Sequence, residues 1–290
     1  MATLRDIKNR IKGVQNTQQI TKAMKMVSAA KLRRAQDRVI NARPYARKIS
    51  ELLNHLVTEE DYNNPFIEER EVKKIGLMVV TADRGLCGAF NTNIIKEGTN
   101  FIENLPDSNS ASIFCVGKKG FEFFGKRNYH IIDKKIGLFS NLDYSFATSI
   151  TNELIKLYLE SSFDKIFIIY NEFKSIIQQK IITEQFLPIP IKKGNNKEER
   201  KNEPYYIFEP DQRSIFKYLL PKHLKAQMWR ILLESNAAEF GARMTAMDNA
   251  TTNAKELIRT LQLKYNKERQ AAITKEILEI VSGANALKAS

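Results

Sequence analysis

The C-terminal quarter of the sequence contains almost nothing that would break a helix. After Pro221 there is no further proline, and the only glycines are Gly241 and Gly283. A helix from 211 to about 286 would be on the order of 110 Å long, which is too long for an ordinary globular helix. Alanine recurs at every fourth position along one face, at Ala238, Ala242, Ala246, Ala250 and Ala254. The stretch therefore predicts a coiled coil in which a second helix approaches this small-residue face.

The N-terminal segment has the pattern expected of that second helix. Apolar or small residues recur at steps of three and four, at Leu4, Ile7, Ile11 and Val14, and again at Leu32, Ala35, Val39, Ala42, Ala46, Ile49, Leu53 and Leu56. The seam is interrupted by polar residues from Gln15 to Gln19, and Pro44 should bend the helix or remove one backbone hydrogen bond. Two terminal helices that flank a middle domain must run antiparallel if they pair.

Between the two helices, short apolar runs alternate with helical patterns. We expect strands at 75–81, 112–116, 130–133, 165–170 and 175–186, and helices at 92–105, 121–127 and 145–161. Such alternation is typical of an α/β domain with a largely parallel, Rossmann-like sheet. The predicted organisation is a shaft helix over 1–60, an α/β domain over 72–208 and a second shaft helix over 211–286. The charged stretch 194–204 is expected to be an exposed or disordered loop.

Two glycine-containing turns could suggest a phosphate-binding loop. The first runs from Asp83 to Gly88 and the second from Gly117 to Gly120, but neither has the spacing of a phosphate loop or a dinucleotide fingerprint. We expect the first to be a tight turn that exposes Asp83 or Arg84 to a partner. No catalytic constellation or metal-ligand spacing is recognisable, so the sequence predicts no catalytic residue, no cofactor and no metal.

Cys87 and Cys115 are the only cysteines. They form no Cys-x-x-Cys pair and lie in apolar surroundings, which is typical of packing residues in a reducing compartment. No apolar run is long enough to span a membrane, and the N-terminus has no signal-peptide pattern.

Positive charge is concentrated at the N-terminal end. Residues 1–48 hold thirteen Lys or Arg and only two acids, Asp6 and Asp37, within a chain of net charge +13. A basic helix of this kind favours an acidic partner, which could be nucleic acid, anionic lipid or an acidic protein surface. Charge alone leaves open a basic coiled-coil protein that binds nucleic acid or acts as a scaffold.

Three stretches resemble the gamma subunit family of F-type ATP synthases, in its bacterial form. They are Val14–Leu32, Thr81–Gly88 with Asn91, and a C-terminal pattern of Ile273, Thr274, Glu276, Glu279, Gly283, Ala284 and Ala286. The segments 241–251 and 261–271 extend the likeness, whereas the middle of the chain matches more loosely. The regulatory cysteine pair of chloroplast members is absent, so we infer no thiol switch.

The resemblance implies a function without a catalytic site. Members form the central rotor shaft, an antiparallel coiled coil inside a ring of alpha and beta subunits. The shaft couples ion-driven rotation of the c ring to ATP synthesis on the beta subunits. The implied partners are the alpha, beta and epsilon subunits and the c ring, without nucleic acid and without direct membrane insertion. The implied location is peripheral, on the cytoplasmic side of the bacterial inner membrane.

The resemblance also implies two sets of contact residues. Those toward the ring of alpha and beta subunits are Met24, Lys25, Arg243 and Gln270. Those toward the c ring and epsilon subunit are Tyr206, Phe208 and Glu209. If the C-terminal helix extends past the N-terminal one, its end stands alone, and we expect the apolar residues there, Ile273, Ile277, Leu278 and Val281, to act as a bearing inside the surrounding ring.

Overall fold

The computed structural model describes residues 3–106, 111–176, 178–191 and 208–289. The chain forms two compact units, Met1–Ser28 with Met244–Ser290, and Ala29–Arg243. The predicted loop at 194–204 lies outside the described residues.

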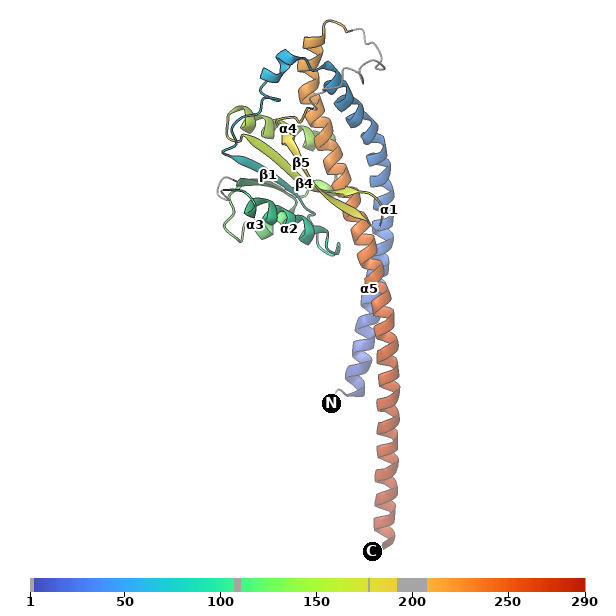
Figure 1. Ribbon diagram of the computed structural model, residues 1–290. Coiled ribbons are helices and arrows are strands. Elements are labelled where there is room, and N and C mark those ends of the chain that lie inside the picture. The colour runs from blue at the N-terminus through green and yellow to red at the C-terminus, as the bar shows by residue number, and fades with distance from the viewer. Residues whose placement is uncertain (1–2, 107–110, 177, 192–207, 290) are drawn as a thin grey trace. The chain divides into compact units, whose positions relative to one another are not determined.

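Two long helices dominate the chain (Figure 1). Helix α1 spans Leu4–Leu56 and helix α5 spans Gln212–Ala289, with 53 and 78 residues. Both predicted long helices are confirmed. Pro44 lies inside α1 and Pro221 inside α5, so neither proline ends its helix.

The helices run antiparallel within the unit formed by Met1–Ser28 and Met244–Ser290. The Lys25 ammonium lies 2.6 Å from the Asp248 carboxylate. Four residues earlier in α1, the Thr21 hydroxyl accepts a 2.8 Å hydrogen bond from the Thr251 hydroxyl, three residues later in α5. The opposite order of the partners in the two helices is the signature of antiparallel pairing, and hydroxyl groups join the helices where the apolar seam is weak.

The same antiparallel order holds within the unit Ala29–Arg243. Arg43 pairs with Glu234, and farther along α1 the Leu56 carbonyl accepts a hydrogen bond from Gln212, at the start of α5. The predicted apolar seam is buried here, at Leu32, Ala35, Val39, Ala46, Ile49, Leu53 and Leu56. The predicted coiled-coil pattern is therefore confirmed by the residues that it buries.

A five-stranded sheet occupies the middle of the unit Ala29–Arg243, in the order β3-β2-β1-β4-β5. The strands are β1 Ile75–Val80, β2 Ala111–Val116, β3 Ile131–Lys135, β4 Lys165–Phe173 and β5 Gln179–Leu187. The first four are mutually parallel, and β5 pairs antiparallel with β4 at the edge. The predicted α/β class and largely parallel sheet are confirmed.

Helices cover both faces of this sheet (Figure 1). Helices α2, Phe90–Glu103, and α3, Lys118–Phe124, lie on one face, and α4, Tyr144–Leu159, lies on the other. All six residues of β1 are buried, as expected for a central strand between two helical layers. Short 3-10 turns at Glu59–Asn63 and Leu138–Ser140 complete the described elements.

Helix α3 starts three residues before the predicted helix at 121–127. At its start, the segment that follows β2 lies close to the segment that follows β1. The Thr81 hydroxyl donates to the Val116 carbonyl and accepts from the Gly120 amide. Gly117 has a φ of +91°, and a Cβ added there would lie 2.0 Å from the Thr81 carbonyl oxygen. Only glycine can join β2 to α3 in this space.

His223 is buried in α5, and burial lowers the pKa of its imidazole to about 4, with nearby Arg230 adding to the effect. The folded chain therefore favours the neutral ring, whereas the unfolded chain takes up a proton below its ordinary pKa of about 6.5. Stability from this group is present above that value and is lost as the pH falls toward 4. We expect about 2 kcal/mol less stability at pH 5 than at pH 7.5 from His223 alone.

Denaturant unfolding of the wild type and of His223→Leu at the two pH values measures this effect. The wild type should lose more stability than the variant on acidification, by the stated amount. His130 is exposed, so His130→Leu is the matched control for replacing an imidazole by leucine. Equal losses in wild type and His223→Leu would contradict the assignment.

Candidate functional site

The structure offers charged clusters and exposed helix faces as candidate sites. In the described part of the chain, no group of three His, Cys, Asp or Glu side chains is placed to hold a metal ion. Across the same residues, no helix is both long and apolar enough to cross a membrane. Both cysteines are buried and free, as predicted for packing residues, and burial raises the pKa of Cys115 to about 12.

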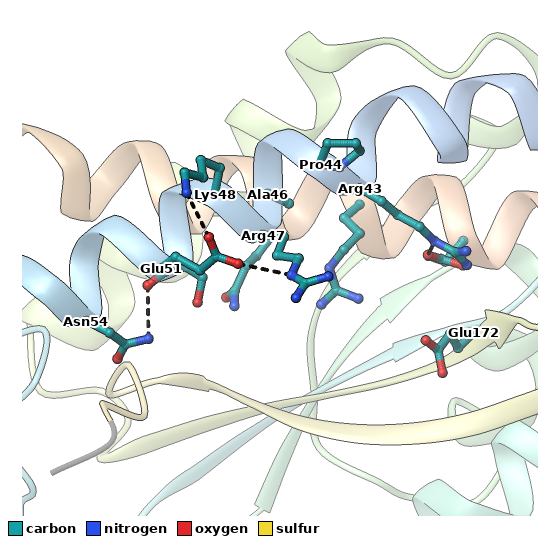
Figure 2. A pocket seen from close by; sticks show the side chains of 12 residues that line it. Arg43, Pro44, Ala46, Arg47, Lys48, Glu51, Asn54 and Glu172 are labelled. Carbon is teal, nitrogen blue, oxygen red and sulfur yellow. Dashed lines mark hydrogen bonds and ion pairs between the residues drawn. The ribbon is translucent and has the colours of Figure 1, made fainter. Parts of the chain in front are cut away.

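An open cavity of about 700 Å³ lies between α1, α5 and the end of β4 (Figure 2). Its lining includes four basic side chains and three acidic ones, Arg43, Arg47, Lys48, Arg230, Glu51, Glu172 and Glu234. Figure 2 shows Glu51 between Arg47 and Lys48, at 3.0 and 3.1 Å. Arg43, Arg47 and Lys48 therefore meet acidic partners inside the lining, whereas Arg230 and Glu172 pair outside it, with Glu184 and Lys174.

The most buried of these partners is Glu234. Its carboxylate accepts hydrogen bonds from Nε and Nη2 of Arg43, at 2.7 and 2.8 Å, and from the Phe173 amide. Arg43 also donates to the Phe173 carbonyl, and the Glu234 hydrogen bonds raise the pKa of its guanidinium. One bidentate ion pair thus joins α1, α5 and the end of β4.

A second cluster joins α5 to the edge of the sheet. Arg230 donates to both carboxylate oxygens of Glu184 in β5, at 2.9 and 2.8 Å, and to the Tyr170 hydroxyl in β4. Burial raises the pKa of Tyr170, so its hydroxyl stays protonated and bonds to Glu184. Such hydrogen-bonded networks of largely buried groups help to fix the arrangement of the elements that they join.

The turn after β1 gathers three loops at one edge of the sheet. Asp83 accepts hydrogen bonds from the Lys118 and Gly137 amides, which follow β2 and β3. Arg84 is exposed, in line with the predicted partner-facing turn, while Asp83 is half-buried and used internally. Leu86 is exposed with a φ of +63°, a conformation that is rare for a residue with a side chain.

Arg243 occupies a buried position behind this turn. It forms a 2.6 Å ion pair with Glu239, and both side chains are buried. Its Nη2 also lies 3.4 and 3.3 Å from the carbonyl oxygens of Arg84 and Gly85. Burial raises the pKa of Glu239, which the charge of Arg243 opposes. Arg243 therefore connects the turn after β1 to α5.

The other ring-contact candidates lie in the unit Met1–Ser28 with Met244–Ser290. Met24 is half-buried, Lys25 is half-buried in its ion pair with Asp248, and Gln270 is exposed. Met24 and Lys25 share one turn of α1. Gln270 lies much farther along α5 than Asp248, the partner of Lys25.

The predicted bearing tip is an exposed helix. Every side chain from Asn266 to Gly283 is exposed, and Figure 1 shows this end of α5 continuing past the start of α1. The large apolar side chains Ile273, Ile277, Leu278 and Val281 are between 49% and 60% exposed. The four residues gather on a helix that lacks a neighbour within the described unit.

The predicted foot residues precede α5. Tyr206 lies outside the described residues. Phe208 is half-buried, and Glu209 is exposed immediately before Pro210. Phe208 is therefore partly accessible and Glu209 fully so, and both belong to the unit Ala29–Arg243.

Sequence reasoning missed the buried charges of α5. Arg230 and Glu234 have partners far away in sequence, Glu184 and Arg43, whereas Glu239 pairs with Arg243 only four residues later. A usable signal was present, since α5 carries an apolar run, Ile231–Leu233, immediately followed by Glu234 and then by two alanines after Asn236. An acid within such a run is expected to be buried and paired.

A family model described as ATP synthase matches residues 3–287. The chain is 52% identical to a protein named ATP synthase gamma chain from Chloroherpeton thalassium, over 303 residues that cover both proteins completely. It is 50% identical to a protein of the same name from Cytophaga hutchinsonii, over 293 residues and 99% of each chain.

Solved structures with a similar fold come from mitochondrial ATP synthases. A chain of the Euglena gracilis complex matches with a TM-score of 0.72 at 21% identity, covering 99% of this chain and 95% of that one. A chain from the Tetrahymena thermophila central stalk and c ring matches with a TM-score of 0.61 at 23% identity, covering 80% and 99%. At these identities the likeness is one of fold.

Proposed function

The chain belongs to the ATP synthase gamma chain family, and from that premise we propose that it is the central rotor shaft of an F-type ATP synthase. It is a non-catalytic subunit that carries the rotation of the c ring to the catalytic beta subunits. Residues 1–60 and 211–286 form the shaft, and 72–208 form the domain that it carries. Its partners are the alpha, beta and epsilon subunits and the c ring.

The exposed helix 266–283 is the observation that carries this proposal. It is roughly 27 Å of helix with no neighbour in its own unit. Several large apolar side chains on a lone helix would favour aggregation unless a partner covers them. A surrounding ring of subunits would provide such a cover.

Apolar contacts at Ile273, Ile277, Leu278 and Val281 suit a bearing. The hydrophobic effect has no preferred direction, so rotation of the helix would break no fixed hydrogen bond. Ion pairs at these positions would instead create preferred angles, because Coulomb energy depends on the separation of fixed charges. The tip is therefore proposed to seat and centre the shaft.

The remaining candidates are proposed as contacts of two kinds. Met24, Lys25, Arg243 and Gln270 face the alpha and beta ring, where the basic N-terminal helix would meet acidic loops of the beta subunits. Tyr206, Phe208 and Glu209 face the c ring and the epsilon subunit, since aromatic residues are enriched at protein interfaces. Through these contacts the chain is held peripherally at the membrane, and we place it on the cytoplasmic side of a bacterial inner membrane.

Truncation of the tip tests the proposal. We expect a chain that ends before Ile273 to assemble more weakly with purified alpha and beta subunits and to produce less torque, because the apolar seat is lost. Some ATP-driven rotation should remain, as the rest of the shaft is intact. Single-molecule rotation and gel filtration measure the two effects.

Removal of Leu287–Ser290 alone is the matched control and should change little. Failure of the full-length chain to join alpha and beta subunits, together with salt-resistant binding to duplex DNA, would favour the nucleic-acid-binding alternative instead. Complete loss of ATP hydrolysis in an assembled head that lacks the tip would contradict a role in seating alone.

A further inference from the structure

A cluster of aromatic side chains lies on the surface of the unit Ala29–Arg243. It comprises Tyr45 of α1, Tyr144 of α4, and Tyr218 and Trp229 of α5, and is called the aromatic patch here. Tyr45, Tyr144 and Tyr218 are 57%, 44% and 62% exposed. Three large aromatic side chains that are exposed together contribute little to the core of the chain. Tyr and Trp are among the residues most enriched at binding hot spots, so the cluster suits a binding surface.

The patch surrounds a hollow of about 440 Å³. Tyr45, Tyr144, Trp229 and Leu233 line it together with Arg38. Tyr144 packs edge-on against Trp229, with ring centroids 5.8 Å apart. Aromatic and aliphatic groups therefore form much of the wall, and the hollow has room for a bulky apolar side chain inserted from outside.

Cations border the patch on both sides. The Arg38 guanidinium lies 5.4 Å from the Trp229 ring and donates to the Leu142 carbonyl, which fixes its position. The Lys222 ammonium lies 4.2 Å from the Tyr218 ring, and the Tyr218 hydroxyl, with Tyr45 and Tyr144 nearby, raises the pKa of Lys222. Lys222 thus stays charged beside Tyr218, at the border of the patch.

The surroundings are short of acids. Between Gln212 and Leu233 the sequence of α5 has five basic residues and no acidic one. Of the carboxylates near the hollow, Asp143 lies close enough to Arg38 to feel its charge, and it caps the start of α4 through the Ser145 amide. The field at the patch is therefore positive, and it favours an occupant with carboxylates.

We propose that the aromatic patch is a docking site for an acidic protein segment with one bulky apolar side chain. The apolar side chain fills the hollow, and carboxylates on either side of it pair with Arg38 and Lys222. The segment belongs to a subunit that turns with the chain, because directional contacts of this kind would be broken if the two slid past each other. This last step rests on the proposed function.

Nucleic acid fits the patch less well than a protein segment. Single-stranded bases bind by stacking on open aromatic faces. Here Arg38 lies over Trp229, and Lys222 lies over Tyr218, so cations already occupy one face of two of the four rings. A membrane surface also fits poorly, since lipid binding requires a protruding apolar face and this site is hollow.

Photo-cross-linking in the assembled complex tests the proposal. The photoreactive amino acid p-benzoylphenylalanine replaces Tyr45 at the rim, and in a control chain it replaces Leu159, which is also exposed but lies at the far end of α4. We expect the Tyr45 position to link to a single peptide that contains both an acidic and a bulky apolar residue. Lys222→Glu should lower the yield at least about tenfold through charge repulsion, and Lys222→Arg should preserve it.

Several results would overturn the docking site. They are a cross-link to lipid or nucleic acid, a cross-linked peptide without acidic residues, and an equal cross-linking yield from position 159. A yield that is the same in Lys222→Glu as in the wild type would also overturn it. A second measurement uses the isolated chain, in which Trp229 is the only tryptophan. Its fluorescence should respond to the synthetic form of the linked peptide and respond more weakly in Lys222→Glu.

The docking site and the proposed function fail in distinguishable ways. Absence of alpha and beta subunits from the purified complex would count against the rotor shaft. A charge-dependent link to an acidic segment of an alpha or beta subunit would keep the docking site and refute its placement on the rotor.

Discussion

Replacing Arg43 by alanine should lower the free energy of unfolding by about 3 kcal/mol. Glu234 is only 1% exposed at its side chain, and it would lose both guanidinium hydrogen bonds and keep the Phe173 amide alone. The buried carboxylate would then lack a compensating charge. The expected loss lies at the low end for a broken buried pair, because the Arg43 side chain is 43% exposed and water can enter in its place.

Chemical denaturation of the isolated chain measures the loss, and Arg47→Ala is the matched control. Arg47 lies one turn farther along α1 and pairs with Glu51, but its side chain is 83% exposed. Surface pairs of this kind contribute at most about 1 kcal/mol, so the control should be close to wild type. Equal losses from the two substitutions would show that burial of Glu234 is not what makes Arg43 important.

The long helices and the sheet could be predicted because their signals are local and periodic. The seam from Leu32 to Leu56 repeats at helical spacing, and β1 is an uninterrupted apolar run between turns. Burial follows directly from those periods, and the structure buries every predicted seam position from Leu32 to Leu56 except Ala42, which is half-buried. Where the period was weakest, near Gln15–Gln19, hydroxyl contacts at Thr21 replace apolar packing, which no hydrophobic pattern could reveal.

The charged clusters could not be predicted because their partners are distant in sequence. Arg43 meets Glu234 across 191 positions, and Arg230 meets Glu184 across 46. A sequence gives the identity of such residues but not their pairing, which depends on the register of two helices and a sheet. The aromatic patch was missed for the same reason, since α1, α4 and α5 each supply only part of it.

For Arg243, the family resemblance and the structure indicate different roles. The resemblance predicts a contact with the surrounding ring, whereas the structure buries the side chain against Glu239. The two roles make separate predictions. If Arg243 is needed only for folding, an apolar pair of similar volume should replace it without loss of function, because buried ion pairs are often no more stabilising than such pairs.

We expect Arg243→Ala to lower the free energy of unfolding by about 3–5 kcal/mol, since Glu239 would remain buried without its partner. The double variant Arg243→Met with Glu239→Leu should recover most of that loss, as measured by denaturant unfolding. Rotation assays on the reassembled complex then separate the roles. A stable double variant with impaired ATP-driven rotation would support the ring contact, and one with normal rotation would refute it. A single variant as stable as the wild type would instead show that the buried pair contributes nothing, because water reaches Glu239 once Arg243 is removed.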